Sequence, residues 1–439
     1  MTLSPHLLPK KLFVELAGGR GGSEAVQHLL IGQDSKRLLL LRAIRDLGGD
    51  DARYAYKLLA DIQASVPEVT KAVLRYPTVG SWGLRTLQAL NGQTAPNPLA
   101  SPGGMAAVTA AAAIRSERRE TIEVPVLAGE VALPSLGRAS VPGDNAFAVV
   151  RTGAGEAEIV VGGITVRVDP AADGPGWERL RRIRASHRGV EVDFVIDDLD
   201  PHRMPGAKRT ERRLTEAELD QWTTTLRPAW EILVDRHRQV AEEIRTVVTV
   251  LTPLVAPENG TSSATSKLAF GNIGMSTPPD PHSFAVTLAH EAQHAKLSGL
   301  IDLIPLTLPD DGSRYYAPWR DDPRPLGGLL QGAYAHMGIA AFWQVERTKP
   351  HSADLLLRAH TEFVHWRDGT EAAIRVLRSS GGLTAEGDLF TAEMANAMVA
   401  MCEEPVPVEA ARRAEISARR HRADWLRRNG EPPAGQVLD

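Results

Sequence analysis

Two histidines four residues apart are the strongest chemical signal in the chain. His290 and His294 belong to the sequence HEAQH. Residues four apart on an α-helix lie on one face, one turn above the other, so both imidazoles can reach a single divalent metal ion. Glu291, between them, can reach a metal-bound water or act as an acid or base. The spacing therefore predicts a metal centre in which His290 and His294 are ligands.

The flanking residues favour a helix around this motif. Asp280 is a good N-cap, Pro281 suits the first helical position, and the apolar run SFAVTLA leads into the histidines. Gly299 is expected to end the helix. The alternative is that His290 and His294 are ordinary surface or core histidines, and the helical context favours the metal site.

A third protein ligand is needed, and the sequence leaves two possibilities open. Leu297 and Leu300 stand where an extended metalloprotease motif would carry a glycine and a third histidine. Asp302 lies two turns beyond His294. His336 lies in the apolar run LLQGAYAHMGIAAFWQ, which predicts a buried helix. We favour His336 as the ligand, although a lone histidine in such a run is commonly a core residue.

Two arginines between these segments could bind an anion. Arg320 and Arg324 flank Asp321 and Asp322 in the sequence WRDDPRP. A guanidinium grips a carboxylate through two parallel hydrogen bonds. The loop is therefore either a set of Arg–Asp ion pairs or a clamp beside the metal for a substrate carboxylate or an organic-acid cosubstrate.

The elements around these residues predict an α+β protein, mostly helical, with an antiparallel β region and a zincin-like HExxH metal helix. Helical spacing covers 6–115, interrupted by a turn-rich YPTVGSWG near Pro77, and returns from Leu214. Short β-prone runs separated by Gly and Pro fill 120–200, and 246–255 is a further strand. We expect a helical region over 1–118, a β-rich region followed by a helix over 119–255, a metal-binding core over 256–350 and a C-terminal helical region over 351–439.

Composition excludes several classes of protein. The 439 residues carry a net charge of −4 and only 5% aromatics, which disfavours a nucleic-acid binder. A single cysteine, Cys402, rules out an internal disulfide or a multi-cysteine zinc site, and it is expected to be a small core residue. No convincing signal peptide or membrane-spanning stretch is present, so we expect a cytoplasmic protein.

Several blocks resemble one known family. TLAHEAQHAKLSGLIDLIPL, YYAPWRDDPRPLGGLLQGAYAHMG and AFWQ are similar to the HExxH-motif peptide-modification proteins associated with radical SAM peptide maturases, and YPTVGSWG fits the same family. The resemblance is specific over about 260–345 and weaker over 70–90. It implies modification of ribosomally made precursor peptides, with a radical SAM maturase as a possible partner.

Some members of that family resemble iron(II)- and 2-oxoglutarate-dependent peptide β-hydroxylases. The resemblance implies that His290, His294 and His336 bind the metal, that Glu291 is an acid/base or supporting group, and that Arg320 and Arg324 hold the 2-oxoacid. The leading hypothesis is therefore peptide β-hydroxylation. The alternatives are a zinc peptidase that trims the precursor, with Glu291 as general base, and a non-catalytic peptide-binding partner of a maturase.

Overall fold

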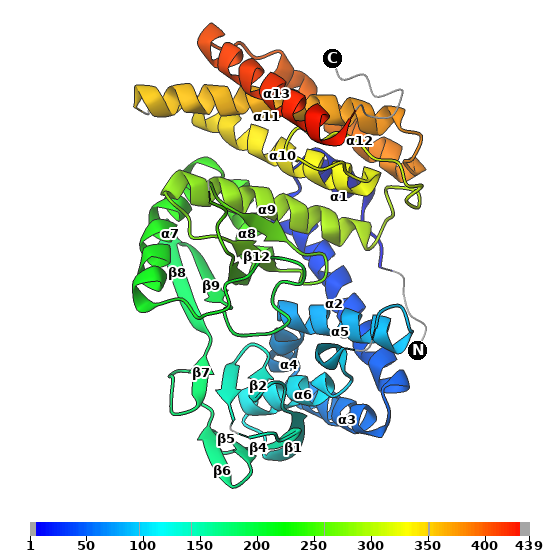
Figure 1. Ribbon diagram of the computed structural model, residues 1–439, viewed down its shortest axis with the longest axis vertical. Coiled ribbons are helices and arrows are strands. Elements are labelled where there is room, and N and C mark those ends of the chain that lie inside the picture. Colours follow the sequence, from blue (N-terminus) through cyan, green and yellow to red (C-terminus); the bar gives the residue numbers. More distant parts are fainter. Residues whose placement is uncertain (1–5, 96, 142, 259, 350–351, 431–439) are drawn as a thin grey trace.

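The structure is a computed structural model that describes residues 6–95, 97–141, 143–258, 260–349 and 352–430. It is an α+β fold that is mostly helical and contains antiparallel sheets, as the sequence predicted. Figure 1 shows three layers along the longest axis: C-terminal helices at one end, a sheet covered by helices in the middle, and helices beside small sheets at the other end.

The N-terminal helices run through two of these layers. The long helix α2 contributes Leu29 and Leu30 to the core around the central sheet, and Leu41 and Ile44 to the core at the far end. The bounds are α1 Lys10–Ala17, α2 Gly22–Leu47, α3 Asp50–Ser65, α4 Pro67–Leu74, α5 Pro77–Leu90, the 3₁₀ turn η1 Pro98–Ala100 and α6 Gly104–Arg115.

Helix α5 corrects the prediction of a turn-rich interruption at YPTVGSWG. Pro77 occupies the first turn of this helix, where the missing N–H costs nothing. Gly80 and Gly83 lie against other parts of the chain: a Cβ at Gly80 would meet the Leu268 carbonyl at 3.3 Å, and one at Gly83 would meet Leu40 at 3.6 Å. The glycines therefore serve close packing rather than a turn.

Two small antiparallel sheets follow α6. One has the order β1-β4-β5-β6 and the other β2-β3-β7. Side chains along β4 alternate between buried and exposed, as expected for a sheet with one covered face. The bounds are β1 Glu120–Pro125, β2 Glu130–Leu133, β3 Gly137–Ser140, β4 Phe147–Gly153, β5 Glu156–Val161, β6 Ile164–Arg167 and β7 Trp177–Arg179.

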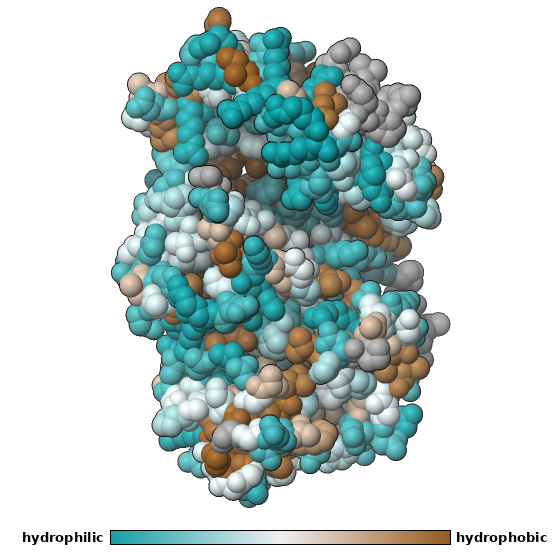
Figure 2. All heavy atoms as spheres, in the orientation of Figure 1, coloured by the Kyte–Doolittle hydropathy of each residue, from teal (hydrophilic) through white to brown (hydrophobic). Residues whose placement is uncertain are grey.

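Hairpin turns set the register of these strands. Ala154 and Gly155, between β4 and β5, both have positive φ (52° and 80°), the backbone of a tight two-residue turn that matches the twist of the strands. Figure 2 shows apolar side chains gathered at this end of the molecule, where Phe147 and Ile164 are exposed.

The central sheet is mixed: β8 and β9, within the predicted 120–200 region, are antiparallel as expected, and the parallel pairs involve strands from later in the chain. Its order is β11-β12-β10-β9-β8, with β9 parallel to β10 and β10 parallel to β12. All four residues of β10 and of β12 are buried, the pattern of strands covered on both faces. The elements are β8 Arg181–His187, β9 Val190–Ile196, α7 Glu216–Arg236, α8 Arg238–Val247, β10 Val250–Pro253, β11 Ser263–Thr265 and β12 Asn272–Met275.

Helix α9 connects this sheet to the C-terminal helices. It contacts α7, α8 and β11 on one side and α10 on the other (Figure 1). Gly299 does not end it, because the helix continues to Ile301 and Gly299 packs against Phe270. The remaining bounds are α9 Pro281–Ile301, α10 Leu326–Glu346, α11 Ala353–Ser379, α12 Ala385–Cys402 and α13 Val408–Asn429.

The last helices show two further features. Cys402, predicted to be a core residue, is exposed at the end of α12. The visible surface of the C-terminal helices is largely hydrophilic (Figure 2). Among the described residues, no helix combines the length and apolarity that crossing a membrane requires.

Candidate metal centre

Helix α9 places His290 and His294 side by side. Its first turn is capped by Asp280, whose carboxylate accepts a hydrogen bond from the Ser283 N–H at 2.9 Å, and Pro281 takes the first helical position. The rings of His290 and His294 have centroids 4.8 Å apart and planes at 89°. The predicted helix and its N-terminal capping are both present.

Helix α10 brings a third imidazole to the pair. It packs along α9, and the ring of His336 lies 4.9 Å from that of His290, with the planes at 71°. Nitrogen–metal bonds of about 2.0–2.1 Å would place two imidazoles on one ion roughly 4.5–5.2 Å apart, centroid to centroid. The His290–His294 and His290–His336 separations fall in this range.

The hydrogen bonds of two rings leave the same nitrogen free. His336 Nδ1 donates to the Gly332 carbonyl at 2.8 Å, and His294 Nδ1 donates to the Gln331 side-chain oxygen at 3.1 Å. Their Nε2 atoms therefore carry lone pairs. This is the arrangement of metal-binding histidines, whose second nitrogen is held by an oxygen.

Burial keeps the rings of His336 and His290 neutral. His336 is only 7% exposed, stacked on Trp319 (4.2 Å, 15°) and close to Trp366 (4.7 Å). Burial, and next the neighbouring His290, lowers the pKa of His336 well below its ordinary value. Burial followed by the proximity of His294 lowers the pKa of His290 to about 4. A metal ion binds imidazole in the neutral form.

His290 adds an unpaired polar atom to the cluster. Its Nδ1 is buried and makes no hydrogen bond of normal geometry with the described residues, although the Ala335 backbone lies close enough to act on its pKa. Across the described residues, no group of three or more His, Cys, Asp or Glu side chains is arranged so that it could hold a metal ion. The structure brings three imidazoles together, and their use as metal ligands is part of the proposal below.

Glu291 is almost fully buried beside the histidines. It is 1% exposed, and its Oε2 accepts a hydrogen bond from the Thr265 hydroxyl at 2.6 Å. Its Oε1 lies 3.9 Å from His290 Nε2. The carboxylate is thereby directed toward the histidine cluster and held from β11, the edge strand of the central sheet.

Asp302, the alternative third ligand, faces a different helix. Its Oδ2 accepts hydrogen bonds from Lys36 at 2.6 Å and Gln33 at 2.7 Å, both on α2. Asp302 follows the last residue of α9 as its C-cap. The structure therefore brings His336, rather than Asp302, to the two motif histidines.

Arg320 and Arg324 grip a carboxylate of their own loop. Arg320 Nε donates to Asp322 Oδ1 at 2.8 Å, and Arg324 Nη1 donates to Asp322 Oδ2 at 2.9 Å. Burial acts to raise the pKa of Asp322, but the hydrogen bonds from Arg324 and Arg320 outweigh it and lower that pKa. The neighbouring Asp321 pairs with Arg428 of α13 at 2.7 Å.

For four residues near the histidine cluster, the sequence had predicted no role. Thr265, Gln331, Trp319 and Trp366 hold Glu291 or the imidazoles through the contacts above. Gln331 could have been found, because it lies five residues before His336 on the same predicted helix. Thr265 and Trp366 lie on segments that no local pattern connects to the motif.

Comparison of the chain with models of known protein families and with curated proteins gives no match.

Proposed function

We propose that this protein is a metal-dependent enzyme that modifies a peptide, with His290, His294 and His336 as the metal ligands. The observation that carries the proposal is the convergence of three imidazoles from two packed helices, two of which have Nδ1 hydrogen-bonded to an oxygen. The buried Glu291 beside them supplies an acid/base group. The zincin-like character of the metal helix is part of this proposal.

The reaction we favour is β-hydroxylation of a residue in a ribosomally made precursor peptide, with iron(II) and 2-oxoglutarate. Bound iron would activate dioxygen, so that one oxygen atom enters the peptide C–H bond and the other enters 2-oxoglutarate, which leaves as succinate and carbon dioxide. Arg320 and Arg324 already hold the Asp322 carboxylate. A carboxylate of the 2-oxoacid would replace that of Asp322.

The edge of the central sheet supports a peptide as substrate. Within the described part of the chain, β11 pairs only with β12, so its other edge could accept an added strand. Thr265 in this strand contacts Glu291 directly. An extended peptide on this edge would pass beside the histidines. We further propose that a radical SAM maturase is the partner of this protein and that the protein acts in the cytoplasm.

A zinc peptidase is the second candidate. Its support is Glu291 Oε1, 3.9 Å from His290 Nε2, which would act as the general base toward a metal-bound water. In this reaction Glu291 would activate the water that attacks the peptide carbonyl.

The metal site is tested first by loading. Purified protein should bind close to one equivalent of iron(II) under anaerobic conditions, or of zinc, measured by elemental analysis after desalting. His336→Ala should weaken metal binding by tenfold or more, because it removes one of the three histidine ligands. Asp302→Ala is the matched control and should leave metal affinity unchanged. Loss of binding in Asp302→Ala but not in His336→Ala would overturn the assignment.

The reaction is tested with the iron-loaded and the zinc-loaded protein. With iron, dioxygen, 2-oxoglutarate and a peptide substrate, the hydroxylase yields succinate and a peptide heavier by one oxygen atom. The peptidase instead cleaves the peptide in the presence of zinc, and Glu291→Gln abolishes cleavage. A protein that binds neither metal would be the non-catalytic peptide-binding partner, and the enzyme proposal would fail.

A further inference from the structure

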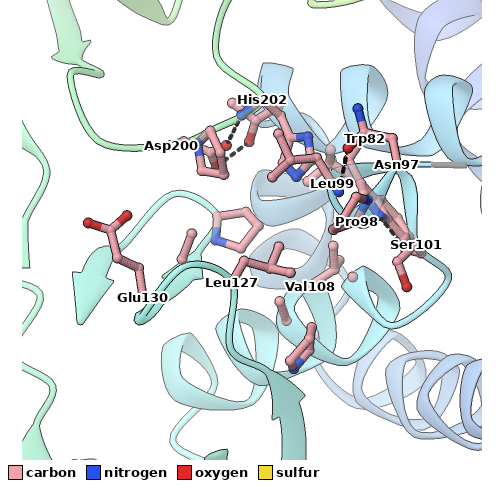
Figure 3. Close-up of a pocket in the computed structure, with 18 of the residues that line it drawn as sticks. Trp82, Asn97, Pro98, Leu99, Ser101, Val108, Leu127, Glu130, Asp200 and His202 are labelled. Carbon is pink, nitrogen blue, oxygen red and sulfur yellow. Dashed lines mark hydrogen bonds between the residues drawn. The ribbon is translucent and has the colours of Figure 1, made fainter. Parts of the chain in front are cut away.

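A second cavity lies away from the histidine cluster, at the end of the molecule built from α5, α6 and the small sheets. Its volume is about 470 Å³, within the range typical of small-molecule sites. Three parts of the chain enclose it: the helices α5 and α6 with η1, the segment from the end of β1 through β2, and the loop that follows β9 (Figure 3).

Most of the cavity wall is apolar and rigidly held. Trp82, Leu99, Val108 and Leu127 contribute large apolar surfaces. The Trp82 indole N–H donates to the Ser101 carbonyl at 2.9 Å, and a Cβ on Gly104 would meet that indole at 2.2 Å. The YPTVGSWG segment, which the histidine site does not use, therefore supplies part of this wall.

At one end of the cavity, the polar residues are hydrogen-bonded to one another. Asp200 accepts a hydrogen bond from the Thr78 hydroxyl at 2.8 Å and another from the His202 backbone N–H at 2.8 Å. Figure 3 shows Asp200 and His202 together at this end of the cavity. Because the Thr78 hydrogen is already donated, its oxygen and the Asp200 carboxylate present only acceptors to a ligand.

His202 adds an unsatisfied atom at the same end. Its Nδ1 is buried and makes no hydrogen bond with the described residues, and it is an acceptor in the neutral tautomer that carries its proton on Nε2. Burial, and next the charges of Arg85 and Arg209, lowers the pKa of His202 to about 4, so its ring is neutral near pH 7. A buried polar nitrogen without a partner costs free energy, and a ligand that pairs with it recovers that cost.

We propose that this cavity binds an apolar ring system bearing one hydrogen-bond donor, of the indole or phenol class, with the donor directed at the His202–Asp200 end. The apolar wall takes the ring, and the group of acceptors takes the N–H or O–H. Such a ring could belong to a free small molecule or to an aromatic side chain of a peptide, and the test separates these two sources.

The test compares indole with indene, which has the same bicyclic shape but no N–H. Binding to the full chain is measured by ligand-observed NMR and calorimetry. Indole should bind more tightly than indene by roughly three- to tenfold, the effect of one neutral hydrogen bond. In His202→Phe the preference should vanish or reverse, whereas His360→Phe, a histidine of α11 outside this cavity whose Nδ1 is also buried and unpaired, should preserve it.

A cavity-filling variant keeps the test independent of His202. Ala107→Trp should abolish binding of both ligands, while circular dichroism verifies the fold. N-acetyl-tryptophanamide should bind if the natural ligand is a peptide side chain, and only indole should bind if it is a free molecule. Equal affinity for indole and indene in the unaltered protein, a preference that survives His202→Phe, or binding that survives Ala107→Trp would each overturn the proposal.

Discussion

Two buried carboxyl groups, Glu346 and Asp197, lie in opposite environments, and each environment determines the pH at which the group becomes charged. Glu346 is fully buried and surrounded by Arg236 at 2.6 Å, His237 at 2.9 Å and His282 at 3.5 Å. Burial acts to raise its pKa, but the hydrogen bonds from these neighbours lower that pKa far below the usual range. Asp197, in contrast, accepts its hydrogen bonds from the Tyr76 hydroxyl and two backbone N–H groups.

Asp197 makes stability dependent on pH. Burial, and next the charge of Asp200, raises its pKa to about 7, whereas the unfolded chain releases this proton near pH 4. The folded state therefore holds more protons between pH 4 and 7, and the group's contribution to stability decreases as pH rises through that window. Asp197→Asn should remove this dependence. Between pH 5 and pH 8, the free energy of unfolding of Asp197→Asn should rise relative to that of the unaltered protein by on the order of a few kcal/mol.

Chemical denaturation of both proteins at pH 5 and pH 8 measures this difference. Asp193→Asn is the control. Hydrogen bonds from Arg182 lower the pKa of Asp193 despite partial burial. The contribution of Asp193 to stability is complete above the pKa that this residue has in the unfolded chain. Asp193→Asn should therefore change the free energy of unfolding equally at the two pH values. An equal effect of Asp197→Asn at both pH values would contradict the raised pKa.

Single elements position the candidate site through close contacts. Trp319, in the loop before α10, lies flat against the backbone of that helix at Gly332 and stacks on His336 one turn later. A Cβ on Gly332 would meet the Trp319 indole nitrogen at 2.3 Å. The absence of a side chain at Gly332 thus sets the position of Trp319, and Trp319 in turn sets the plane of the His336 ring.

Gly332→Ala should therefore weaken metal binding. The methyl group must displace Trp319 and with it His336, and loss of a residue that orients a metal ligand typically costs about 10–100-fold in affinity. Gly327→Ala, in the same helix, is the matched control because its Cβ would meet nothing closer than 3.8 Å. Metal titration of the two variants provides the comparison. Equal affinities would show that Trp319 does not position the ligand.

At the scale of the whole molecule, the beginning of the chain is tied to the helix that carries the candidate site. Lys296 of α9 is 1% exposed and pairs with Glu243 of α8 at 2.8 Å. Its ammonium also donates to the carbonyls of Gly19 and Arg20, and Gln293 donates to Gly19. The turn between α1 and α2 is thereby attached to α9.

Lys296→Met should destabilise the protein by about 3–5 kcal/mol, because it leaves the Glu243 carboxylate buried without a cation. The double variant Lys296→Met with Glu243→Gln should recover a large part of this loss, since no unpaired charge remains. Denaturant unfolding of the two single variants and the double variant completes a mutant cycle. Additive losses would show that the two side chains do not act as a pair.

The sequence by itself determined features that depend on neighbours along the chain. Asp280 and Pro281 mark the start of α9, and the spacing of His290 and His294 places them on one face, because the helical repeat is a local property of the backbone. The apolar run around His336 predicted a buried helix, which is α10. The α+β class and the short strands after residue 119 were predicted on the same local grounds.

Only the tertiary structure decided which distant groups meet. It placed His336 beside His290 and turned Asp302 toward Lys36, although the sequence allowed either residue as third ligand. It also joined Thr265 to Glu291 and made β9 parallel to β10. These outcomes depend on how helices and strands pack across hundreds of residues, and burial and shape complementarity, rather than local spacing, select among the possible pairings.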